Sequence, residues 1–68
     1  MKNSVLITMN IFWKKHPINE RYFYFSENHT LILLRINDFP DEPLCTLING
    51  LDILDIDDIP IKWVLEKL

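Results

Sequence analysis

Carboxylates are the side chains in this sequence that could most readily do chemistry, and they gather in one stretch. Residues 38–58 hold seven acidic side chains and no Lys or Arg, whereas the other residues hold three acidic and seven basic ones. A surface of this kind attracts a basic partner and speeds its capture. The alternative is that the acids only keep the protein soluble, and the sequence leaves that alternative open.

Asp55 and Asp57 are two positions apart in the acidic stretch, and Asp58 follows directly. On a strand, this spacing places the first two side chains on one face, as a cation site would require. The Ca²⁺-binding loop pattern, with its central Gly and distant Glu, is absent, and Mg²⁺ usually needs a phosphate as well. We therefore predict no metal site and expect Asp57 or Asp58 to cap a helix.

Nucleophilic catalysis would need a Cys or Ser beside a base. Cys45 lies in an apolar run, and neither His16 nor His29 belongs to a motif that would orient it. No Ser stands in a Gly-x-Ser-x-Gly elbow, and the single Gly cannot build a phosphate-binding loop. We predict no catalytic residue and no cofactor, so the protein is expected not to be an enzyme, with Cys45 buried as an apolar side chain.

Aromatic residues at 12–13 and 22–25 lie close in sequence to Lys14, Lys15 and Arg21. Such a set could form a stacking platform for single-stranded nucleic acid. The formal net charge of −3 and the isoelectric point near 5.1 oppose binding to phosphates. We therefore expect no nucleic-acid partner and assign these rings to the core or to an interface.

The size and composition of the chain restrict its organisation. It has 68 residues, of which 49% are hydrophobic, so it is expected to fold as a single domain over residues 1–68. Residues 1–8 are expected to form a flexible extension that the core does not need. The single Cys excludes an internal disulfide, and the apolar N-terminal segment has no signal-cleavage pattern and is too short to span a bilayer. These features predict a cytoplasmic protein without a membrane partner.

Aromatic and apolar runs separated by turn residues predict the antiparallel strands that position the acids. Residues 20–25 and 30–36 predict one hairpin, which turns at residues 26–29. Residues 44–48 and 51–56 predict a second hairpin around Asn49-Gly50, in a type I′ turn. Pro40 and Pro43 interrupt the ladder between the hairpins, and residues 5–13 could add a further strand.

The spacing of apolar residues changes at the C-terminal end. Ile61, Val64, Leu65 and Leu68 follow the period of one helical face, and Pro60 suits a first helical turn. The sequence therefore predicts an α+β fold, a small antiparallel β-meander of four or five strands with a short C-terminal helix that closes one face.

Residues 30–36 are apolar on both sides of the predicted strand. A sheet buried on both faces has such a continuous apolar run, yet one short helix can cover only one face. A second copy of the chain is the simplest cover for the other face, so we predict a homodimer.

A resemblance rests on the segment Asn-Asp-Phe-Pro-Asp-Glu-Pro-Leu at 37–44, on residues 46–50, and on the acidic segment 55–60 with Trp63. Over residues 35–63 the chain resembles small uncharacterised bacterial proteins, some of which are thought to be immunity-like partners of toxins. The resemblance implies a bacterial cytoplasmic protein with a binding role and provides no catalytic residue to transfer.

These observations together predict a non-catalytic acidic interaction module, in one version an immunity or inhibitor protein that binds a basic partner. Phe39 would be the buried anchor of the interface. The expected partner-binding residues are Asp38, Phe39, Asp41, Glu42, Asp55, Asp57 and Asp58. The alternatives are a structural or accessory homodimer and, less favoured, a small metal-dependent enzyme.

Overall fold

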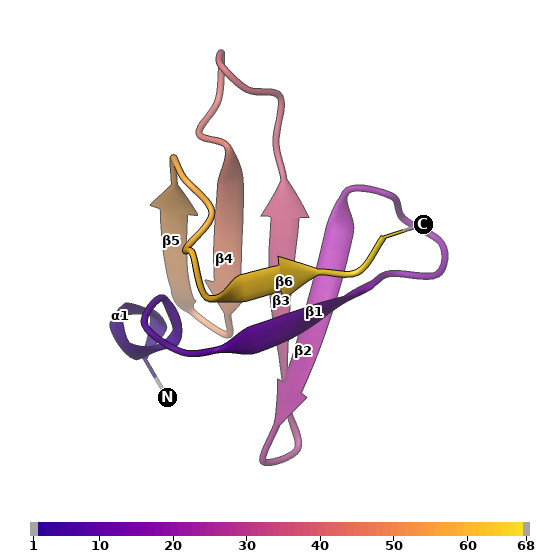
Figure 1. Cartoon of the computed structure of the whole chain (residues 1–68), viewed down its shortest axis with the longest axis vertical. Helices are drawn as coiled ribbons and strands as arrows, with labels where there is room; N and C mark the ends of the chain where they lie inside the picture. The colour runs from indigo at the N-terminus through magenta and orange to yellow at the C-terminus, as the bar shows by residue number, and fades with distance from the viewer. Residues whose placement is uncertain (1, 68) are drawn as a thin grey trace.

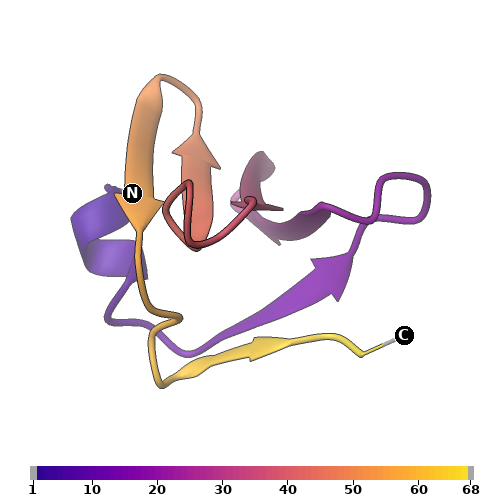
Figure 2. The ribbon, with the colours of Figure 1, turned by 90° about the horizontal axis from the view of Figure 1, so that it is seen from above.

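Six strands form one mixed sheet in the order β5-β4-β3-β2-β1-β6 in the computed structural model, which describes residues 2–67. Strands β1 to β5 pair in an antiparallel manner with their neighbours, and β6 pairs with β1 in parallel. The sheet curls into a half-barrel, so that β1 and β6 face β4 and β5 across the core (Figure 1 and Figure 2). The elements are α1 (Asn3–Leu6), β1 (Ile11–Lys15), β2 (Tyr22–Glu27), β3 (Thr30–Ile36), β4 (Cys45–Asn49), β5 (Asp52–Ile56) and β6 (Trp63–Leu65).

The predicted α+β fold with a C-terminal helix is wrong, because residues 63–65 form strand β6 and the rest of the described C-terminal segment is not helical. Within β6, Trp63 is 5% exposed, Val64 is 56% exposed and Leu65 is partly buried, which is the alternation of a strand. Ile61, which the helical stripe would bury, lies before the strand and is 98% exposed. A helix of two turns is marginal alone, whereas pairing with β1 satisfies the backbone of this segment along its length. Leu68, the last member of the apparent helical stripe, lies outside the described residues. No helix follows Asp57 and Asp58 in the described chain, so neither residue caps one.

Among residues 2–67 the one helix is the short α1 near the N-terminus, which connects the two open edges of the sheet. Asn3 donates its backbone N–H to Asp52 Oδ2 at 3.0 Å and its side-chain amide to the Asp52 carbonyl at 2.7 Å, which ties α1 to β5. Trp63 of β6 donates its indole N–H to the Leu6 carbonyl at 3.1 Å. Residues 3–6 are therefore packed, and Leu6 is fully buried.

Two indole rings lie at the centre of the core inside the curl. Trp13 is fully buried and packs edge-on against Trp63, with ring centroids 5.1 Å apart, and against Phe25 at 5.9 Å. Inward positions of neighbouring strands lie in register, as in the row of Phe23, Leu34, Leu47 and Leu54. The side chains that complete the buried core are Leu6, Ile11, Ile32 and Cys45.

Both predicted hairpins are present, each with a two-residue turn. Asn28 and His29 have positive φ of 48° and 65°, as the turn of type I′ between β2 and β3 requires. Between β4 and β5 the predicted turn is displaced by one residue, because Asn49 pairs with Asp52 and the turn residues are Gly50 and Leu51. Gly50 has a φ of 61° at the first turn position and Leu51 does not have a positive φ, which fits type II′ rather than I′.

The side chains that alternate with the core on β2 to β5 belong to the other face of the sheet. This part of the sheet turns that face away from β1 and β6, as the path of the ribbon in Figure 2 shows. In the described residues no helix or second sheet covers these side chains. This outer face consists of Tyr22, Tyr24, Leu31, Leu33, Arg35, Thr46, Ile48, Ile53 and Asp55.

Candidate functional site

Six of the seven predicted partner-binding residues lie at one end of the sheet. Strands β3 and β5 run in the same direction, and Ile36, Cys45 and Ile56 form the last row of the ladder at that end. The β3–β4 loop and the segment after β5 both extend beyond this row (Figure 1). We call this set the acidic end; its members are Asp38, Phe39, Asp41, Glu42, Asp57 and Asp58.

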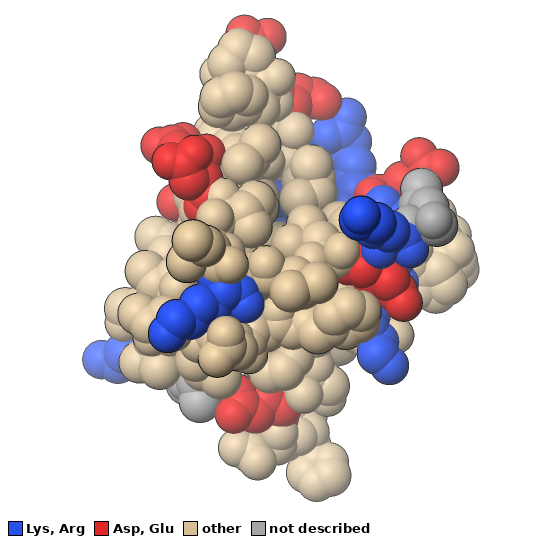
Figure 3. Space-filling view, in the orientation of Figure 1, with Lys and Arg blue, Asp and Glu red and all other residues tan. Residues whose placement is uncertain are grey.

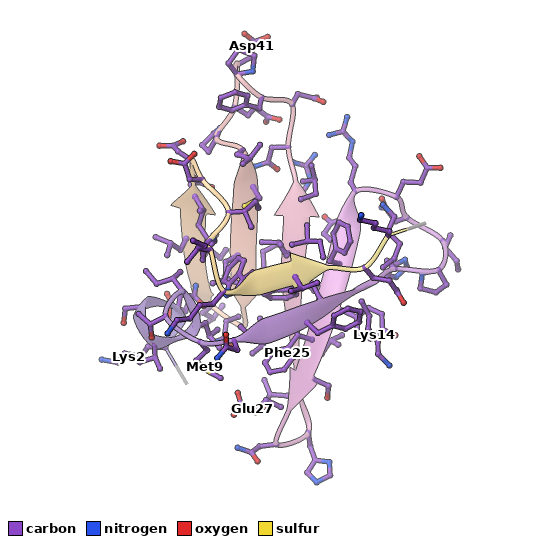
Figure 4. All side chains as sticks on the ribbon, viewed as in Figure 1. Lys2, Met9, Lys14, Phe25, Glu27 and Asp41 are labelled. Carbon is purple, nitrogen blue, oxygen red and sulfur yellow. The ribbon has the colours of Figure 1, made fainter. Side chains whose placement is uncertain are left out.

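All six side chains of the acidic end are exposed to solvent. Figure 3 shows carboxylates over the top of the molecule and at its upper left, where the β3–β4 loop and the end of β5 lie. Phe39 is 59% exposed between them. Asp41 stands at the tip of the loop (Figure 4).

Hydrogen bonds within the β3–β4 loop hold its shape. The Asn37 N–H donates to the Leu44 carbonyl at 3.1 Å and closes the base of the loop. Glu42 donates its backbone N–H to the Asp38 carbonyl at 2.9 Å, and its carboxylate accepts the Asp38 N–H at 3.0 Å. A loop that is ordered before binding loses less conformational entropy when it meets a partner.

The structure adds one residue that the sequence analysis missed, Arg21 from the connection between β1 and β2. Its guanidinium donates to the Asp38 carboxylate at 2.7 Å and to the Ile36 carbonyl at 3.2 Å. The hydrogen bond from Arg21 to Asp38 raises the pKa of the guanidinium above its ordinary value. The positive charge of Arg21 therefore offsets the negative charge of Asp38. No local sequence pattern predicts this pair, because the two residues are 17 positions apart.

Asp55, the seventh predicted residue, lies in β5 on the outer face rather than at the acidic end. It accepts a hydrogen bond from the Thr46 hydroxyl at 2.8 Å, and that hydroxyl accepts one from the Asn37 amide at 2.8 Å. The Arg35 guanidinium donates to the oxygen of the same Asn37 amide. This chain of hydrogen bonds positions the buried Asn37 at the base of the loop, so the role of Asp55 is to support the loop from β5.

The structure provides no reactive nucleophile at Cys45. The Cys45 side chain is fully buried, and burial raises the pKa of its thiol to about 11. A thiol with this pKa is protonated at neutral pH and is a poor nucleophile.

Among residues 2–67, no three His, Cys, Asp or Glu side chains are grouped so that they could hold a metal ion. Of the aromatic residues considered for a stacking platform, Trp13 and Phe23 are buried in the core, whereas Phe12 is 52% exposed. The described part of the chain also contains no helix that is long and apolar enough to cross a membrane.

The chain matches no protein-family model, no curated protein and no solved structure.

Proposed function

We propose that this protein is a non-catalytic interaction module whose acidic end binds a basic surface of another protein. The observation that carries the proposal is that the β3–β4 loop and the end of β5, which are separate in sequence, meet at one end of the sheet with their carboxylates exposed.

The charge that this end offers to a partner comes mainly from three residues. Arg21–Asp38 is the ion pair found within the described residues, and Glu42 also interacts with the same guanidinium through its charge. Asp41, Asp57 and Asp58 form no ion pair among those residues. Exposed charges of one sign raise the rate at which an oppositely charged protein arrives, and salt screens this effect within about 10 Å at 0.1 M. The acidic end is therefore suited to fast capture of a basic protein.

Phe39 would supply the apolar contact that charges alone do not give. It stands exposed in a loop whose base is hydrogen-bonded, and aromatic anchors ringed by charge are frequent hot spots of interfaces. An immunity or inhibitor protein that binds a basic toxin, the role suggested by the resemblance over residues 35–63, is one concrete form of this proposal.

The test uses two double variants with the same change in charge. Asp41→Asn with Asp58→Asn removes two charges from the acidic end, and Glu20→Gln with Glu27→Gln removes two charges elsewhere. Partners are captured from bacterial lysate with the natural chain, identified by mass spectrometry, purified, and their association rates with each variant are measured over a range of salt.

We expect the acidic-end variant to associate several-fold more slowly than the natural chain and with a weaker dependence on salt, because steering by charge is reduced. The control variant should keep the natural rate. Equal association rates for the two variants would overturn the proposal, and so would a partner whose contact surface is acidic.

The two alternative functions differ in support. A metal-dependent enzyme has no supporting group of ligands among residues 2–67. A homodimer is favoured by a separate observation, the composition of the outer face.

A further inference from the structure

The outer face carries a continuous apolar row. Tyr24, Leu33, Ile48 and Ile53 are register partners on four adjacent strands, so their side chains lie side by side across the face. Leu31 extends the row on β3 and is 57% exposed, and Ile53 is 62% exposed. Contiguous exposed apolar surface on a small protein commonly marks an interaction site.

The two flanks of this row carry opposite charges. At the β2 side, Lys14 is the register partner of Tyr24, and the two line one hollow of the surface together with Phe12 and Ser26. At the β5 side stands Asp55, next to Ile53 on the same face. The outer face therefore has Lys14 beyond its β2 flank and Asp55 at its β5 flank, with Arg35 on β3 beside the apolar row, in the same register row as Asp55.

We propose that the outer face is the interface of a homodimer, in which a second copy of this chain packs on it about a two-fold axis parallel to the strands. Such an axis reverses the order of the strands across the interface. The β5 flank of one copy then meets the β1–β2 flank of the other, while the apolar middle meets itself.

Charge selects this axis over the other two-fold axis that lies in the plane of the interface. A two-fold axis perpendicular to the strands would stack β5 on β5 and would bring the acidic flanks of the two copies together. Like charges across an interface disfavour association. The parallel axis instead brings the Asp55 flank of each copy toward the flank of the other copy that carries Lys14, so that charges of opposite sign lie across the interface.

The area of the outer face indicates how tightly the two copies should bind each other. Four strands about 4.8 Å apart, each contributing about five residues of 3.3 Å, give a face of about 300 Å² in projection. This is smaller than the about 800 Å² per partner of a standard specific interface, so we expect a weak dimer, with a dissociation constant of micromolar or higher, rather than a permanent one.

The dimer would present its two acidic ends in the same direction, because a rotation about an axis parallel to the strands does not reverse the direction in which the strands run. This consequence rests on the proposed function, whereas the dimer itself depends on other residues. Asp41→Asn with Asp58→Asn should therefore not weaken self-association, which separates a failure of one proposal from a failure of the other.

The test is sedimentation equilibrium from about 1 to 500 μM, with circular dichroism to show that each variant is folded. Ile53→Lys places a cation on the flank that should meet Lys14 of the second copy, and it changes an exposed side chain. We expect it to weaken self-association by at least tenfold. Ile61→Lys is the matched control, since Ile61 is 98% exposed and lies outside the outer face.

Adding Lys14→Glu to Ile53→Lys should restore self-association, because the new pair again has opposite charges across the interface. A natural chain that stays monomeric up to 500 μM would overturn the proposal. If the outer face then captured a different protein, that protein rather than a second copy would be its binding partner. Equal effects of Ile53→Lys and Ile61→Lys would show that the dimer uses another surface. Failure of Lys14→Glu to rescue would exclude the parallel two-fold axis.

Discussion

At the scale of single residues, burial decides the chemistry of Cys45 and hydrogen bonding decides the roles of the acids. The Cys45 thiol is enclosed by the core at the row that ends the β3–β4–β5 ladder. Asp38 and Asp55 have equivalent side chains to Asp41, but each has a protein partner, Arg21 and Thr46 respectively. The residues that remain available to a basic partner are therefore fewer than the acids in the sequence.

Cys45 leads to a prediction about alkaline pH. Its pKa is raised from 9.0 in the unfolded chain to about 11 in the folded one, so the folded protein favours the neutral thiol. The contribution of Cys45 to the free energy of unfolding is then fully present below pH 9 and falls as the pH rises from 9 to 11. Above that range the whole contribution, about 2–3 kcal/mol, is lost.

Urea unfolding at pH 7 to 11 checks this, with Cys45→Ala as the comparison. The loss specific to Cys45 is the part of the pH dependence that the variant no longer shows. If the natural chain and the variant lose stability in parallel, the thiol does not have the raised pKa.

At the scale of elements, the sheet consists of two hairpins, β2–β3 and β4–β5, extended by the parallel pair of β1 and β6. The helical turn α1 contacts both of its edges. Strand β6 is only three residues long, yet it brings Trp63 onto Trp13 and onto the carbonyl of Leu6. The Glu66 N–H donates to the Trp13 carbonyl at 2.8 Å, and the Glu66 carboxylate accepts the Lys15 N–H at 2.8 Å. The C-terminal segment is thus fastened to β1 beyond the strand itself.

The strand and helix alternatives for this segment predict different costs of substitution. Trp63 of strand β6 is buried, whereas Ile61 lies before the strand and is exposed, so Trp63→Ala should lower the free energy of unfolding by about 3–5 kcal/mol. Ile61→Asn should change it by less than about 0.5 kcal/mol. In a helix that packs its apolar stripe on the sheet, Ile61 would be a core residue, so a cost of several kcal/mol at Ile61 would contradict the strand. Urea unfolding of the two variants measures both values.

At the scale of the whole molecule, the proposed dimer and the proposed acidic end combine into one mode of action. The acidic ends of the two copies would point the same way, and two linked binding sites hold a surface that carries many partner molecules more tightly than one site does. A homodimer would therefore dissociate from such a surface more slowly than a monomer.

Surface plasmon resonance on a densely coupled basic partner measures this effect. We expect the natural chain to dissociate at least tenfold more slowly than the Ile53→Lys variant at high partner density, and at a similar rate at low density. Slow dissociation of both proteins at high density would show that the avidity does not come from the outer face.

The sequence by itself determined the features that depend on near neighbours: the two hairpins, the alternation of inward and outward side chains, and the asymmetry of charge. These follow from turn chemistry at Asn28 and Gly50 and from the two-residue period of strands. Only the tertiary structure decided that residues 63–65 pair with β1, that Arg21 neutralises Asp38, and that Asp55 is separated from the acidic end. Each of these depends on contacts between distant segments, such as Lys15 with Glu66 across 51 positions. The local spacing at Ile61, Val64 and Leu65 suited a helix, but pairing with β1 and burial of Trp63 stabilise the strand, and no local pattern contains that information.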